Sequence, residues 1–309
     1  MGTHVLRPRH RRRRLHRPPH RHRTRRRRAP RRQLQPGFPG IPRPDVTVVQ
    51  GELFDIPRLL TVLADHDIDA IVHTAAMSHP TYSLSFPVAT FAANSEGTVA
   101  VFEAARLHGV SRLVNFSSET VYGRNDSGVI DESQPVNPST PYAVTKVSGE
   151  WLGRVYAQRY GIDVVSLRIA QVYGPGNRMD EIVRDVMRGV VHENAFAIPH
   201  GADHSYNLIY VRDVASAALA AVTADARSER PLAYNISSSE YWSLAGILDE
   251  VRLAYPGAAV SAGPGLEPTL DLQGQFSIEL ARTDLGYEPQ WPLRAALADY
   301  GTWLGDHDS

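Results

Sequence analysis

The chain has 309 residues, of which 33 are Lys or Arg and 33 are Asp or Glu, and it contains no cysteine. The lack of cysteine excludes a disulfide framework, cysteine catalysis and a cysteine metal site. The sequence contains no apolar run of about 18 residues, so it predicts no membrane span. The formal net charge of zero hides an uneven distribution, because the first 44 residues hold 16 arginines and no acid.

The remainder of the chain is acidic, with 17 basic and 33 acidic residues. An acidic surface disfavours nucleic acid and anionic membranes as natural partners. None of the histidines outside the basic stretch shows the spacing of a zinc site. We therefore expect a cytoplasmic protein that binds a small molecule and no metal, nucleic acid or membrane.

Residues 7–32 are the most unusual stretch, with fifteen Arg, four His and four Pro. A disordered basic arm for nucleic acid is one interpretation. A targeting peptide is a second, although the stretch lacks the apolar core of a secretion signal. A reading-frame error in the source gene is the third, and we favour it because GC-rich DNA read in a wrong frame gives such residues. We assign residues 1–43 to a disordered segment rich in Arg, Pro and His.

After this segment the hydrophobic periodicity alternates between strands and helices. It predicts strands near 46–49, 70–75, 112–117 and 163–168, and helices near 56–66, 86–108 and 140–160. This alternation predicts an α/β fold with a doubly wound parallel sheet.

Two units follow from this pattern. We assign residues 44–170 to a Rossmann-like domain and residues 171–309 to a smaller substrate-binding lobe. Segments near 207–223 and 233–236 return from the lobe to the sheet, and the Pro/Gly-rich stretch 256–268 is predicted to be a surface loop.

A short apolar strand ends in small hydroxyl residues at Ser117 and Ser118. Open α/β folds bind their ligands at the carboxyl edge of the parallel sheet. Ser118 is therefore predicted to hydrogen-bond a substrate oxygen at this edge.

Lys146 is the only lysine of the chain, and it follows Tyr142 by four residues. Every other residue counted as Lys or Arg is an arginine. The guanidinium of arginine binds through a planar fork, whereas the ammonium of lysine is compact and stands on a flexible stem. Positions i and i+4 share one face of a helix, so both side chains point the same way. A nearby ammonium favours the phenolate and lowers the tyrosine pKa, which suits a general acid/base acting on a hydroxyl.

Three motifs occur in order: Ser-Ser-Glu-Thr-Val-Tyr-Gly at 117–123, Pro-Tyr-Ala-Val-Thr-Lys at 141–146, and Leu-Arg-Ile-Ala-Gln-Val-Tyr-Gly-Pro at 167–175. They closely resemble the extended short-chain dehydrogenase/reductases, the NAD-dependent epimerase/dehydratase group. The resemblance runs from about residue 46 to the end. The family's Gly-x-x-Gly-x-x-Gly turn is expected near residues 7–14 and is missing there, so the first βα unit is apparently lost.

The resemblance implies NAD or NADP as cofactor and a set of residues beside it. Tyr142 and Lys146 are expected at the nicotinamide, whereas His73 is interpreted as a core histidine. The further cofactor-binding residues that it implies are Leu53, Ala75, Ala76, Asn94, Ser117 and Ile169.

The implied chemistry is hydride transfer at a carbon that bears a hydroxyl, with Ser118, Tyr142 and Lys146 as catalytic residues and Glu119 as a further acid/base. The family's 4,6-dehydratases carry an Asp-Glu pair after the serine position, and this chain has Glu119 and Thr120 there. We expect an epimerase or dehydrogenase because the second carboxylate is absent.

A nucleotide sugar is the leading substrate by family frequency, and a sugar acid or a polyol is the rival. The substrate residues implied are Thr120, Gln171 and Arg178, and Arg178 or Arg184 could supply charge for a diphosphate. A homodimer is expected as well. The alternative to an enzyme is a noncatalytic product that has lost its cofactor site.

Overall fold

A computed structural model of the chain describes residues 5–8, 46–177, 179–192, 194–227 and 229–307. Its main sheet has the strand order β1-β2-β3-β5-β9, and the last four of these strands run parallel to one another. The bounds are β1 Val5–Pro8, β2 Ile68–His73, β3 Arg112–Ser118, β5 Asp163–Ile169 and β9 Tyr234–Ile236.

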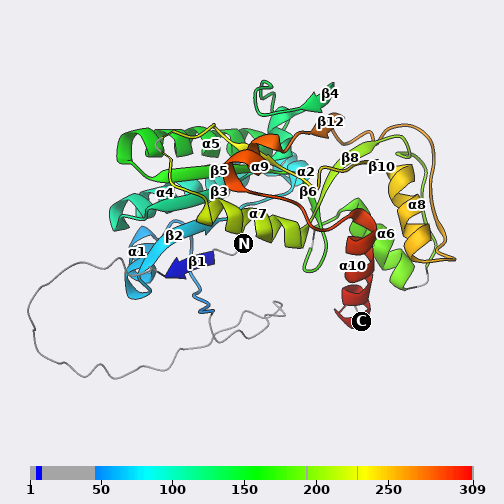
Figure 1. Ribbon diagram of the computed structural model, residues 1–309, viewed down its shortest axis with the longest axis horizontal. Helices are drawn as coiled ribbons and strands as arrows, with labels where there is room; N and C mark the ends of the chain where they lie inside the picture. The colour runs from blue at the N-terminus through cyan, green and yellow to red at the C-terminus, as the bar shows by residue number, and fades with distance from the viewer. Residues whose placement is uncertain (1–4, 9–45, 178, 193, 228, 308–309) are drawn as a thin grey trace, which may run out of the picture.

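Helices cover both faces of this sheet (Figure 1). Side chains alternate along β3, because Leu113 packs in a cluster with α1, α4 and α5, whereas the adjacent Val114 packs in a cluster with α7 and α9. The doubly wound α/β prediction is therefore confirmed. The bounds are α1 Ile56–Asp65, α4 Gly97–His108, α5 Pro141–Tyr160, α7 Val211–Thr223 and α9 Glu279–Leu285.

Short elements connect these layers. The segment before α4 contains α2, α3 and a π-helical turn, and a 3-10 turn follows β3. The bounds are α2 Pro80–Ser85, α3 Pro87–Phe91, π-helix Ala92–Glu96, 3-10 helix Glu119–Tyr122, and the parallel pair β4 Asn125–Ile130 and β12 Gln273–Phe276.

The strand predicted at 46–49 is wrong, because residues 46–50 form no secondary structure. The strand β1 occupies the edge of β2 and runs antiparallel to it, with Val5 opposite Val72. Residues 46–49 thus lack a strand to pair with, and the Val48 side chain stays 55% exposed. Apart from β1, the predicted disordered segment 1–43 lies outside the described residues.

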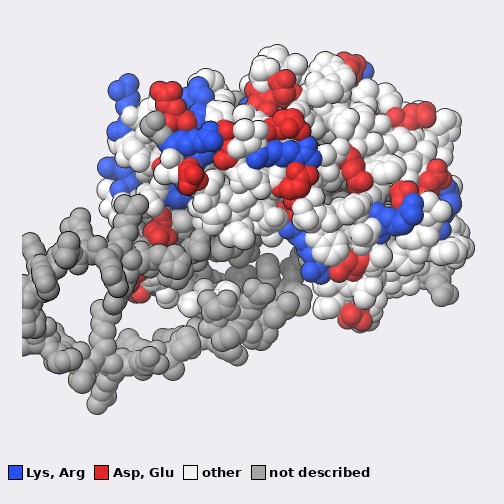
Figure 2. All heavy atoms as spheres, viewed as in Figure 1, with Lys and Arg blue, Asp and Glu red and all other residues white. Residues whose placement is uncertain are grey.

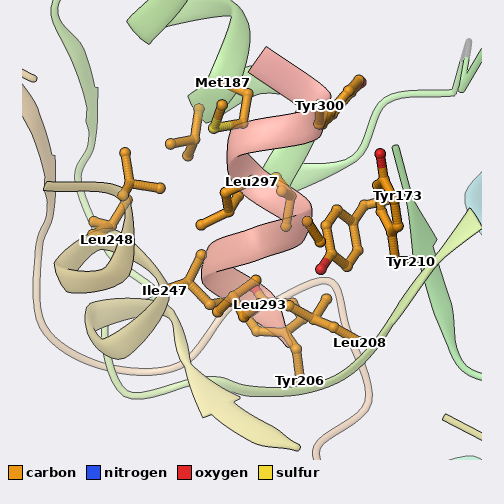
Figure 3. Close-up of a cluster of buried hydrophobic side chains, with 14 of the residues drawn as sticks. Tyr173, Met187, Tyr206, Leu208, Tyr210, Ile247, Leu248, Leu293, Leu297 and Tyr300 are labelled. Atoms are coloured by element: carbon orange, nitrogen blue, oxygen red, sulfur yellow. The ribbon is translucent and has the colours of Figure 1, made fainter. Parts of the chain in front are cut away.

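The carboxyl-terminal lobe has its own core (Figure 3), a buried cluster that includes tyrosines of the strands, leucines of α10 and Met187 of α6. The strands β10, β8 and β6 form its sheet. The bounds are β6 Gln171–Tyr173, β7 Phe196–Ile198, β8 Ser205–Tyr210, β10 Tyr241–Ser243, β11 Val260–Ala262, α6 Ile182–Val191, α8 Leu244–Ala254 and α10 Leu293–His307.

One further expectation needs correction in this lobe. The stretch 256–268 is not only a loop, because β11 lies within it and pairs in parallel with β7. Whether this stretch forms a strand depends on its pairing with a distant segment, and the local content of Pro and Gly gives no information about that pairing.

The described helices include none that is long and apolar enough to cross a membrane. Acidic and basic side chains are mixed over the face that Figure 2 presents. The described surface on this side therefore carries no single sign of charge.

Candidate active site

The site begins where β3 ends. Ser118 is the last residue of β3 and lies opposite Ile169 of β5 in the parallel register. Its hydroxyl oxygen accepts hydrogen bonds from the Thr120 backbone N–H at 3.3 Å and from Thr120 Oγ1 at 3.0 Å. Thr120, predicted as a substrate residue, thus serves to orient the Ser118 hydroxyl.

The helix α5 brings the tyrosine and the lysine to this serine. Thr140 caps the helix by accepting the Ala143 N–H at 3.2 Å, and a proline begins its first turn. Tyr142 is only 7% exposed, and its phenol hydrogen-bonds the Ser118 side chain. Lys146 Nζ donates to the Phe116 carbonyl at 2.7 Å and lies 5.5 Å from the centre of the Tyr142 ring.

Burial dominates the ionisation of these two groups. It raises the pKa of Tyr142 to about 12, against the opposing hydrogen bond from Ser118 and with a smaller contribution from the charge of Glu119. It lowers the pKa of Lys146 to about 8, and the charge of Glu150 opposes that fall. The expected fall of the Tyr142 pKa is therefore not seen in this structure, where desolvation of the phenolate is the largest influence and raises the pKa.

Two carboxyl groups meet at Gln171. The Glu119 carboxylate accepts the Gln171 backbone N–H, and burial raises the pKa of Glu119 to about 8. Gln171 Nε2 donates to Glu181 Oε1 at 3.2 Å, and burial raises the pKa of Glu181 to about 7.

Sequence reasoning missed Glu181, which caps α6 by accepting the N–H groups of Val183 and Arg184. The signal was an acid directly before an amphipathic helix. The position after Glu119 is Thr120, as expected, and Glu181 is a separate buried carboxyl that contacts the Gln171 side chain.

Two of the predicted cofactor-binding residues, Leu53 and Asn94, lie near α4. Leu53 packs so closely on Gly97 that a Cβ at that glycine would lie 2.9 Å from Leu53 Cδ1. Asn94 is 3% exposed; its Oδ1 accepts the Met77 N–H at 2.7 Å and its Nδ2 donates to Thr145 Oγ1 at 3.0 Å. Asn94 thus ties the loop after β2 to α5.

The remaining residues predicted to bind the cofactor lie at or just after the ends of β2, β3 and β5. Ala75 is buried and Ala76 half-buried, directly after β2. Ser117 donates to Glu150 at 2.5 Å, so its hydroxyl is directed into the core. His73 is 3% exposed and hydrogen-bonds Thr98 Oγ1 at 3.0 Å, as expected of a core histidine.

The arginines expected to supply charge for a diphosphate are Arg178 and Arg184. Arg178 lies outside the described residues. Arg184 binds Asp180 and Asp185, each at 2.9 Å, so two carboxylates already compensate its charge. Tyr206 is 5% exposed and belongs to the core of the lobe.

Comparison with known proteins points to the same family as the motifs do. The family model described as "NAD dependent epimerase/dehydratase family" matches residues 4–237. An uncharacterized protein of Methanocaldococcus jannaschii is 27% identical over 259 residues, which cover 84% of this chain and 78% of that one. A dTDP-glucose 4,6-dehydratase of Streptomyces niveus is 36% identical over 135 residues, which cover 44% of this chain and only 40% of the dehydratase.

A solved structure resembles most of the fold. The UDP-glucuronic acid 4-epimerase from Bacillus cereus, in complex with UDP-glucuronic acid and NAD, superposes with a TM-score of 0.70 and 25% identity. The match covers 82% of this chain and 80% of that one. The motifs, the fold and the match over most of the chain agree, and the chain belongs to the NAD-dependent epimerase/dehydratase family.

Proposed function

We propose that this chain is an NAD(P)-dependent epimerase or oxidoreductase that acts on a hydroxyl-bearing carbon of a sugar, with a nucleotide sugar as the leading substrate. The observation that carries the proposal is the meeting of the Ser118 hydroxyl, the Tyr142 phenol and the Lys146 ammonium at the carboxyl edge of the sheet. Serine orients the substrate oxygen, tyrosine exchanges its proton, and lysine holds the cofactor ribose.

The described residues fit the nicotinamide half of the cofactor. Only one Lys146 N–H is directed at Phe116, so an ammonium with three donors keeps N–H groups for ribose hydroxyls. When bound, NAD(P) accepts and returns the hydride. The pyrophosphate half has no glycine-rich turn, because the sequence contains no glycine between Gly2 and Gly37.

The test is Tyr142→Phe, assayed with UDP- and dTDP-sugars on this chain and on a version with a glycine-rich first βα unit. We expect turnover to fall by about 10² to 10⁴-fold because the proton-exchanging group is removed. Tyr156→Phe is the matched control, since Tyr156 lies on the same helix, is 8% exposed and loses one hydrogen bond to Glu103. Full turnover in the Tyr142 variant contradicts the assignment.

Elimination of water is the second candidate reaction, and the paired carboxyls favour it. Glu119 and Glu181 flank Gln171, and burial raises the pKa of both. A neutral carboxyl can protonate a leaving hydroxyl, and an ionised one can take a proton. Against elimination, Thr120 occupies the position of the dehydratases' second acid.

We also propose a homodimer and a cytoplasmic location. Apolar side chains are exposed on the neighbouring helices α3, α4 and α5, with Val88 at 83%, Val99 at 40%, Trp151 at 51% and Val155 at 46%. A surface of this kind marks an interface, and a two-fold axis lets it bury itself. Light scattering should give twice the chain mass for the wild type and a monomer for Trp151→Glu, and a monomeric wild type contradicts the dimer.

A further inference from the structure

The surroundings of Lys146 disfavour its protonated, charged form. Its Nζ points into the sheet and donates to the carbonyl of Phe116 at 2.7 Å. The aromatic face of Tyr142 lies on one side of it. A neutral carbonyl and a ring stabilise an ammonium less than water does, so a buried lysine at this site tends to lose its proton.

Glu150 stands one helical turn beyond Lys146 on α5. Its side chain is 1% exposed and its carboxylate receives three hydrogen bonds. Arg168 of β5 donates two of them, from Nε at 2.9 Å and from Nη2 at 2.8 Å, and Ser117 of β3 donates the third at 2.5 Å. Neighbouring residues of β3, Phe116 and Ser117, thus bind Lys146 and Glu150.

Arg168 is itself held in one orientation. Its Nη1 donates to the Tyr122 hydroxyl at 2.8 Å, and that hydroxyl donates to Asn235 Oδ1 at 2.7 Å. Arg168 is 2% exposed, so the whole chain of polar groups is enclosed. A buried ion pair is weak evidence for stability, because desolvation offsets its attraction. This network therefore calls for a role beyond holding β5 to α5.

The other titratable groups around Lys146 do not replace this carboxylate. Glu119, from the 3-10 turn, couples to Tyr142 and is kept largely neutral by burial. His73, from β2, hydrogen-bonds Thr98 of α4. On its own helix Lys146 has the phenol of Tyr142 before it and Glu150 after it.

We infer that Glu150 is a positioning residue for the proposed reaction: its carboxylate, locked by Arg168 and Ser117, is the fixed counter-charge that keeps the Lys146 ammonium protonated beside Tyr142. The inference rests on the proposed function for its catalytic meaning and on geometry for the electrostatic coupling. The charge of Glu150 indeed opposes the fall of the Lys146 pKa that burial causes.

The chain offers a direct measurement, because Lys146 is its only lysine. Protein grown with ¹³C-lysine gives a single side-chain ¹³Cε signal, whose shift against pH reports the protonation of Lys146. In the wild type we expect a midpoint at about 8. Glu150→Gln keeps the shape and removes the charge, so its midpoint should fall by about 1 pH unit. Glu150→Asp restores the charge and should return the midpoint towards the wild-type value.

Asp163→Asn is the matched control. Asp163 binds Arg230 at 2.6 Å and Arg112 at 2.9 Å at the opposite end of β5. Its loss should lower the melting temperature and leave the lysine midpoint unchanged.

If Glu150→Gln does not fold, the double variant Glu150→Gln/Arg168→Gln removes both buried charges together and should still lower the midpoint. A wild-type midpoint in the folded Glu150→Gln variant, or an equal shift in Asp163→Asn, overturns the inference. The titration needs no turnover, so an inactive chain with a Glu150-dependent midpoint would sink the proposed function and leave this coupling standing.

Discussion

Replacing Glu119 by glutamine should make the protein more stable at neutral pH. Burial raises the pKa of this carboxyl from 4.5 to about 8, and among the described residues the only group that opposes the rise is the Gln171 backbone N–H. Glutamine has the same shape and its Oε1 can accept that N–H. The substitution therefore removes an ionisable group without removing a hydrogen bond.

The sign and size of the effect follow from linkage. The folded-state pKa lies above the unfolded one, so the wild type is unaffected below pH 4.5 and loses stability as the pH rises to about 8. Each pH unit in this window changes the free energy of unfolding by about 1.4 kcal/mol. At pH 7 the variant should therefore be more stable by about 3 kcal/mol, and near pH 4.5 the two proteins should be equal.

Urea unfolding at several pH values between 4.5 and 8 measures this difference. Glu52→Gln, which alters an exposed carboxylate, is the control and should give no pH-dependent change. A difference between wild type and Glu119→Gln that stays constant with pH would refute the reasoning. The same variant should lose turnover if Glu119 exchanges protons with substrate, which separates stability from function.

Three further predictions concern packing, cofactor and product. Gly153→Ala should destabilise the protein by about 1 to 3 kcal/mol, because its Cβ would lie 2.8 Å from Val164 Cγ1. Thermal unfolding measures this loss. Gly305→Ala is the control and should be tolerated, because its Cβ would meet nothing within 4 Å. By calorimetry this chain should bind NAD(P) weakly and a chain with a glycine-rich first βα unit should bind it well; equal micromolar affinity would argue for a functional basic terminus. Mass spectrometry should find epimers or ketones, and loss of water would instead favour the paired carboxyls.

Much of the sheet was predictable because its strands are locally distinctive. The runs at 112–117 and 163–168 contain short apolar stretches, Leu-Val and Val-Val, and they lie between helices whose caps can be read from sequence. The Tyr142 and Lys146 pair was also predictable, since helix geometry alone places residues four apart on one face. These features depend only on neighbours in the chain.

The failures depend on partners far away in the chain. Residues 46–49 have strand-like composition, but β1 occupies the neighbouring edge and leaves them unpaired. Glu181 was missed in the sequence, because only the fold brings it to Gln171. The ion pair of Glu150 with Arg168 joins α5 to β5, so neither residue is distinguishable from a solvated charge in the sequence.

The carboxyls of the site differ in their hydrogen-bond partners. Glu150 has a guanidinium at hydrogen-bonding distance and receives three hydrogen bonds. Among the described residues, Glu119 and Glu181 receive hydrogen bonds only from neutral N–H donors, and burial raises their pKa values to about 8 and about 7. At about pH 6, below both values, the edge of the sheet thus presents one ammonium and two mostly uncharged carboxyls to a ligand. Such an arrangement repels an anionic ligand less than two ionised carboxylates would, and the repulsion grows as the carboxyls lose their protons.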